Sequence, residues 1–141
     1  MRLAFAADHA GAILKDDLAA RARAAGHDVV DLGTVGSESV DYPDFGRSCA
    51  ERVAGGEVDR GVVVCGTGIG IAIAANRVAG ARCAVVHDVT TARLARSHND
   101  ANLMALGARV VGTQVAVDCL MAFLDTTFEG GRHQRRVAKL G

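Results

Sequence analysis

Short apolar runs of strand length alternate with segments of helical periodicity, and this alternation restricts the fold more than any other feature of the sequence. Four runs lie at residues 3–7, 27–32, 61–65 and 82–86, and a fifth strand region takes in residues 103–106 with Val110 and Val111. Runs that are nearly all apolar are typical of parallel strands with both faces buried. We therefore predict an α/β fold, in which two helical layers enclose a five-stranded parallel sheet as a three-layer α/β/α arrangement.

Helices are predicted where apolar residues recur at helical spacing between these runs. The predicted ranges are 14–25, 43–54, a small-residue helix ending near residue 77, 90–97 and 114–127. Gly26 is expected to end the first helix and Pro43 to begin the second. Residues from 129 onward are expected to form a short basic tail. With 141 residues and no interdomain linker, the chain is expected to be a single domain spanning residues 1–141.

The composition argues against several classes of partner. Lys and Arg together number 16, as do Asp and Glu, and aromatic residues make up only 4%. We therefore expect no nucleic acid and no membrane as partner. The N-terminal residues lack the apolar stretch of a signal peptide, and the four cysteines form no C-x-x-C pair and no ligand cluster with histidine. These observations predict a cytoplasmic protein with reduced thiols and no metal site.

A glycine-rich segment, CGTGIGI at residues 65–71, follows the third predicted strand. In open parallel sheets, ligands bind beyond the carboxyl ends of the strands. Gly66, Gly68 and Gly70 let backbone N–H groups converge on one point, which suits a phosphate or a developing oxyanion. The spacing matches neither a dinucleotide fingerprint nor a Walker A loop. The alternative interpretation is a tight turn that needs small residues.

Cys65 ends the third predicted strand and precedes a helix, an environment that favours a thiolate. Such a thiolate acts as a nucleophile or a general base. The alternative is a small buried hydrophobic residue, as most free cysteines are. That alternative is the prediction for Cys49, Cys83 and Cys119, which lie in apolar strand or helix patterns.

Polar residues follow the first and second predicted strands. Asp8 and His9 come directly after the first strand, where Asp8 is a candidate ligand contact or a helix cap. Asp41 precedes the helix at Pro43 and is a candidate cap, and Tyr42 is placed to reach a ligand hydroxyl.

Two further polar segments occur in the second half of the chain. SHNDAN at residues 97–102 is either a helix C-terminal cap or part of a site. In the basic tail, Arg132 and Arg136 are four residues apart and would share one face of a helix. Their guanidinium groups suit phosphate oxygens, although a solvated basic end is the alternative.

Taken in order along the chain, these segments resemble the type B ribose-5-phosphate isomerases, whose superfamily includes galactose-6-phosphate isomerase subunits. The resemblance covers essentially the whole chain and rests on the ordered segments DHAG (8–11), DYP (41–43), CGTGIG (65–70), AAN (74–76), HND (98–100), GARVVG (107–112) and EGGRH (129–133). It implies a flavodoxin-like, Rossmann-related fold and a homodimer whose active sites are shared between subunits. Residues 129–141 are then expected to contribute to the partner's site, with pairing of dimers into a tetramer left open.

The resemblance also implies a role for each candidate residue. Cys65 is implied as the base that moves a proton between C1 and C2 of a small sugar phosphate, with the N–H groups of residues 66–70 holding the enediolate oxygen. His98 is implied to open the furanose ring, with help from Asp8. The remaining candidates fall into two groups, the hydroxyl-binding Thr67, Tyr42 and Asn99 and the phosphate-binding His9, Arg109, Arg132 and Arg136.

A second branch of the family has a glutamate base at the position of Ile71, and the apolar Ile71 excludes that base here. We therefore expect interconversion of ribose 5-phosphate and ribulose 5-phosphate without a cofactor. Allose 6-phosphate, galactose 6-phosphate or a tetrulose 4-phosphate is an alternative substrate, although galactose-6-phosphate isomerase subunits generally lack the HND and GGRH segments. A non-catalytic phosphate-binding module is an alternative of another class.

Overall fold

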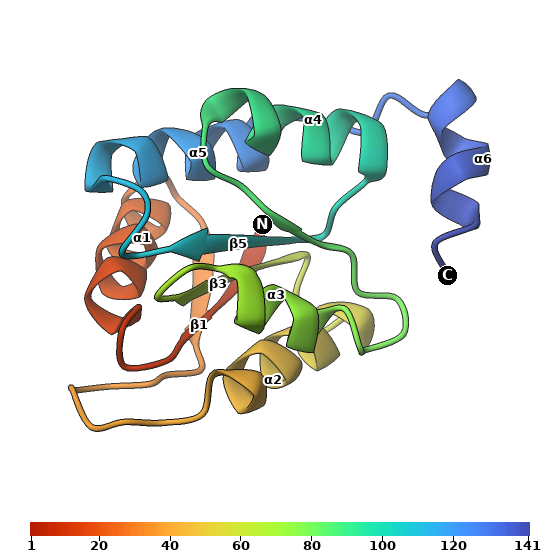
Figure 1. Cartoon of the computed structure of the whole chain (residues 1–141). Helices are drawn as coiled ribbons and strands as arrows, with labels where there is room; N and C mark the ends of the chain where they lie inside the picture. Colours follow the sequence, from red (N-terminus) through yellow and green to blue (C-terminus); the bar gives the residue numbers. More distant parts are fainter.

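The computed structural model describes residues 1–141, which form a five-stranded parallel sheet between two helical layers (Figure 1). The strand order is β2-β1-β3-β5-β4, and each adjacent pair is parallel. The strands are β1 (Arg2–Ala7), β2 (Asp28–Asp31), β3 (Arg60–Cys65), β4 (Cys83–Val85) and β5 (Leu103–Gly107). The predicted fold class is confirmed.

Helices cover both faces of the sheet. The helices α1 (Ala12–Ala24), α4 (Val89–Asn99) and α5 (Thr113–Asp125) pack on one face, and α2 (Tyr42–Ala54) and α3 (Ile69–Ala75) pack on the other. The last helix, α6 (Arg132–Ala138), lies outside these layers and contacts α4 (Figure 1). None of the helices combines the length and apolar character needed to span a membrane.

Alternate residues of each central strand enter opposite halves of the core. Leu3 and Phe5 of β1 face α1, α4 and α5, whereas Ala4 and Ala6 face α2 and α3. Both sets are fully buried, which explains the continuous apolar runs in the sequence. Cys65, the last residue of β3, belongs to the half covered by α2 and α3.

One prediction about local structure was wrong. Val110 and Val111 are not part of the fifth strand, because both of their N–H groups donate to the Gly107 carbonyl at 3.0 Å and form a turn. Residues 132–138 of the basic tail form helix α6. That helix buries His133 and Val137, which lie four residues apart on one face.

Candidate active site

The predicted site residues divide between the two opposite edges of the sheet. Each strand ends at the carboxyl edge, and each following helix runs back to the amino edge. Since α4 begins after β4, its last residues lie at the amino edge. Helix α6, which contacts α4, lies at that edge too. Figure 1 shows α6 on the side opposite the tip of β5. The carboxyl edge carries Asp8, His9, Tyr42, Cys65, Gly66, Thr67, Gly68, Gly70 and Arg109, and the amino edge carries His98, Asn99, Arg132 and Arg136.

The sulfur of Cys65 lies under the glycine-rich loop. The N–H of Gly68 donates to Cys65 Sγ at 3.1 Å. Gly68 has a φ of 79° and packs so tightly on β5 that a Cβ there would lie 2.9 Å from the carbonyl carbon of Leu106. Its backbone therefore requires glycine on two grounds. The sulfur is therefore held directly beneath the main-chain amides of the loop.

A phenol and a guanidinium flank the same loop. A Cβ at Gly70 would lie 2.6 Å from the ring of Tyr42, and one at Gly66 would lie 3.2 Å from Nη1 of Arg109. Arg109 lies just after β5, and its backbone N–H donates to the Gly66 carbonyl at 3.0 Å. This hydrogen bond holds Arg109 beside the loop. The glycines thus make room for two polar side chains, and Cys65, Tyr42 and Arg109 are brought together around one loop.

The turn after β1 joins this edge. The N–H of Asp8 donates to the Val64 carbonyl at 3.2 Å, and Asp8 Oδ1 accepts the N–H groups of Ala10 and Gly11 at 3.0 and 3.1 Å. Asp8 is therefore a turn cap through one oxygen, while Oδ2 makes no hydrogen bond within the chain. His9 Nδ1 accepts the N–H of Val40 at 3.2 Å. That bond leaves the proton of a neutral imidazole on Nε2.

Thr67 is exposed at the tip of the loop, and its Oγ1 accepts the N–H of Ile69 at 3.2 Å. Cys65 itself is only 3% exposed. It lines neither of two clefts of about 330 and 430 Å³, which lie beside β4 and beside the start of α1.

Asp100 has a structural role in the HND segment. It ends α4 with a φ of 44° and accepts hydrogen bonds from Arg96 at 2.9 Å and Arg82 at 3.0 Å. Arg96 is 7% exposed and also donates to the Ala101 carbonyl at 2.6 Å. This buried network fixes the end of α4, which carries His98 and Asn99. Asn99 lines the cleft of about 330 Å³ beside β4.

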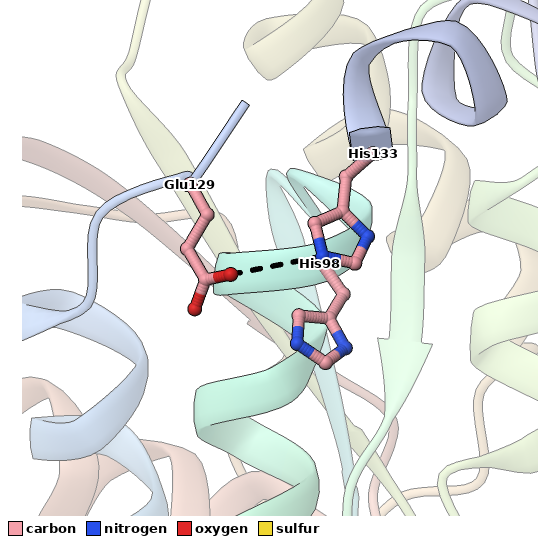
Figure 2. A group of neighbouring side chains, drawn as sticks. All are labelled: His98, Glu129 and His133. Atoms are coloured by element: carbon pink, nitrogen blue, oxygen red, sulfur yellow. Dashed lines mark ion pairs between the residues drawn. The ribbon is translucent and has the colours of Figure 1, made fainter. Parts of the chain in front are cut away.

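The ring of His98 stacks on that of His133, with centroids 4.2 Å apart and an angle of 13° between the planes. Glu129 Oε2 lies 3.6 Å from Nε2 of His133 (Figure 2). Burial, followed by electrostatic interaction with His98 and Arg132, lowers the pKa of His133 below its ordinary value of 6.5. Glu129 and His133 fall in the EGGRH segment noted above, but neither was predicted as a site residue.

His98, Glu129 and His133 are residue types that can bind a metal ion. Their candidate ligand atoms all lie within 4.8 Å of one another. A metal ion binds imidazole in the plane of the ring, at about 2.0–2.1 Å for zinc. Two nearly parallel rings cannot share such an ion, because an ion in one plane lies outside the other. The geometry fits a stacked pair of imidazoles better than a metal centre.

The other three cysteines are placed as structural residues. Burial raises the pKa of Cys49 to about 12 and that of Cys119 to about 11, with Asp88 and Asp118 adding to the effect at Cys119. Burial also raises the pKa of Cys83. These thiols stay protonated and unreactive near neutral pH.

This fold, with a sulfur, an amide-lined loop and a guanidinium at the carboxyl edge of a parallel sheet, defines an α/β protein equipped to handle a small anionic ligand. Residues 3–140 match the ribose/galactose isomerase family. The chain belongs to this family and is a sugar-phosphate isomerase.

Relatives support this assignment over the full length of the chain. Ribose-5-phosphate isomerase B of Escherichia coli is 48% identical over 136 residues, which cover 96% of this chain and 91% of that protein. The solved structure of ribose-5-phosphate isomerase B from Clostridium thermocellum is 52% identical and matches 100% of this chain and 95% of that one, with a TM-score of 0.99. The enzyme from Mycoplasma genitalium with bound ribulose 5-phosphate is 39% identical, with a TM-score of 0.95 over 99% and 93% of the two chains.

Proposed function

We propose that this enzyme interconverts ribose 5-phosphate and ribulose 5-phosphate through an enediolate, with Cys65 as the base. The main support is the position of the Cys65 sulfur beneath the Gly66–Gly70 loop, 3.1 Å from the Gly68 amide. Similarity to relatives that are named ribose-5-phosphate isomerase B supports the choice of substrate.

The reaction moves one hydrogen between neighbouring carbons. The Cys65 thiolate removes the proton from C2 of the open-chain aldose, and the electron pair shifts so that the C1 carbonyl oxygen becomes negatively charged. N–H groups of the loop hold that oxygen, and such a donor is typically worth about 3–4 kcal/mol in the transition state. The thiol then returns the proton to C1, and the proton of the C2 hydroxyl passes to the C1 oxygen as the C2 ketone forms. No electrons enter or leave the substrate, so the chemistry needs no cofactor.

The remaining candidate residues bind and prepare the sugar. His98 opens the furanose ring by proton transfer, with Asp8 Oδ2 contacting the ring oxygen or a hydroxyl. Thr67, Tyr42 and Asn99 hold hydroxyl groups. Arg109, Arg132 and Arg136 bind the phosphate together with His9, whose Nε2–H is a donor because Nδ1 already accepts the Val40 amide.

The two edges of the sheet imply a homodimer with shared sites. Within one chain, Cys65 and His98 lie at opposite edges and cannot act on one small substrate. A second copy brings its own amino edge, with His98, Asn99 and α6, over the Cys65 loop. Ile69 and Ile73 of α3 are each 55% exposed beside that loop, which suits a subunit interface. This homodimer is proposed to be cytoplasmic.

A Cys65→Ala variant tests the assignment of the base. Loss of a general base is expected to lower kcat on ribose 5-phosphate by about 10²–10⁴-fold. Cys119→Ala is the matched control, because Cys119 lies in the opposite half of the core and keeps a raised pKa. Turnover at the parental rate by Cys65→Ala would rule out the proposed chemistry.

The choice among ribose 5-phosphate and the alternative sugar phosphates needs a separate measurement. Turnover of ribose 5-phosphate, allose 6-phosphate, galactose 6-phosphate and a tetrulose 4-phosphate by the same preparation ranks them by kcat/KM. We expect ribose 5-phosphate to rank first. A higher value for another sugar would replace the substrate, and turnover of none would favour a phosphate-binding module without catalysis.

A further inference from the structure

The imidazole of His98 stacks on a second imidazole, that of His133. It lies on the last turn of α4 and is partly exposed, and neither ring nitrogen has a hydrogen-bond partner within the chain. The ring of His133, stacked at 4.2 Å, is the one aromatic group against it. Because the terminal torsion of histidine is broad, an imidazole without hydrogen bonds is oriented only by what it packs on.

His133 is in turn held rigidly by its surroundings. Its side chain is buried, with the residue only 6% exposed, and its backbone N–H donates to the Gly130 carbonyl at 2.9 Å. The preceding segment is tied to α4, because the N–H of Glu129 donates to the Ser97 carbonyl at 3.0 Å. His133 Nε2 is buried without a hydrogen bond, 3.6 Å from Glu129 Oε2. Packing therefore fixes the ring of His133.

We infer that His133 is a positioning residue, which holds the His98 ring by stacking in the orientation that ring opening requires. This inference rests on the proposed function, since it assumes that His98 opens the sugar ring. His133 itself need not touch the substrate. Both nitrogens of His98 stay free for proton transfer, because the stack restrains the ring through its face and not through its edge.

The choice of substrate separates this role from a general structural one. Ribose 5-phosphate is mostly a closed furanose and needs ring opening. A tetrose 4-phosphate cannot close through O4, which carries its phosphate, so it skips that step. Both sugars present a phosphate to Arg132 and Arg136 on α6. A disordered α6 would therefore impair both substrates, whereas a misoriented His98 impairs only the pentose.

Three variants test the inference, with kcat and KM measured on both sugars. His133→Ala removes the stack and is expected to lower kcat on ribose 5-phosphate by roughly 10-fold or more, since a misplaced catalytic group commonly costs up to about 10²-fold. Its kcat on the tetrose 4-phosphate is expected to stay within about 2-fold. His133→Phe keeps a ring to stack on and removes the unpaired nitrogen, so it should retain most of the activity on the pentose. Gln134→Ala, an exposed neighbour on α6, is the control.

Equal losses on both sugars for His133→Ala, or no loss on either, would overturn the inference. So would a His133→Phe variant as impaired on the pentose as His133→Ala. His98→Ala distinguishes failure of the inference from failure of the proposed function. If His98→Ala is selective for the pentose and His133→Ala is not, only the positioning role fails. If His98→Ala affects both sugars equally, the ring-opening role itself fails.

Discussion

Gly70 illustrates how a single residue shapes the candidate site. Its missing side chain leaves the space that the Tyr42 ring fills, since a Cβ would lie 2.6 Å from that ring. The glycine is thus required by a neighbouring polar group and not by its own backbone conformation.

The first prediction at this scale concerns Gly70→Ala. The added methyl displaces Tyr42 or the loop, and kcat/KM for ribose 5-phosphate is expected to fall by about 10-fold. Gly112→Ala is the matched control, because a Cβ there meets no atom within 4 Å. In a Tyr42→Ala background, the same Gly70 substitution should have a much smaller effect, as a double-mutant cycle would reveal. Fully additive losses would show that the two residues are not coupled.

At the scale of elements, α6 depends on the protonation state of His133. The folded-state pKa of His133 is lowered by burial, then by His98, Arg132 and Arg136, while Glu129 opposes the shift. Above the ordinary pKa of 6.5 the imidazole is neutral in both the folded and unfolded states, and stability does not vary through this group. As the pH falls below 6.5, the unfolded chain takes up a proton that the folded chain resists, so stability is lost.

The second prediction therefore compares the melting temperature between pH 7.5 and 5.5. The parent is expected to lose more thermal stability over this range than His133→Phe, which cannot be protonated. Hydrogen exchange of the α6 amides should increase in the parent over the same range. Identical pH dependence in the two proteins would show that His133 is not the responsible group.

The elements also show what the sequence could predict. The five strands were predicted because buried parallel strands are continuous apolar runs, and the fold follows from their alternation with helices. Val110 and Val111 were misassigned because β-branched residues are enriched in strands, and nothing in the local sequence showed that these two lie in a turn. Helix α6 was missed because its apolar face is one histidine and one valine, and its packing on α4 is a tertiary contact.

The candidate site could be predicted only in part. The loop at Cys65 was predictable because spacing and position along one strand define it. The pairing of His98 with His133 was not, since the two residues are far apart in sequence and meet only where α6 packs on α4. The neighbours of Gly66 and Gly70 were likewise beyond the sequence, because they come from α2 and from the turn after β5.

At the scale of the whole molecule, the parallel topology determines which residues can meet. Every helix returns to the amino edge before the next strand begins. Cys65, at the end of β3, is therefore separated by the length of the sheet from His98, at the end of α4. In the proposed homodimer, each protomer supplies two half-sites, and two protomers arranged symmetrically complete two sites.

Subunit complementation tests whether each active site draws residues from both protomers. Cys65→Ala and His98→Ala are each expected to be nearly inactive on ribose 5-phosphate as homodimers. After the two are mixed and allowed to exchange subunits, each heterodimer contains one site with both defects and one site with neither. About half of the dimers are then mixed, so the sample should recover about a quarter of the parental activity. No gain above the parent variants, in a mixture that mass spectrometry shows to contain heterodimers, would contradict a site shared between subunits.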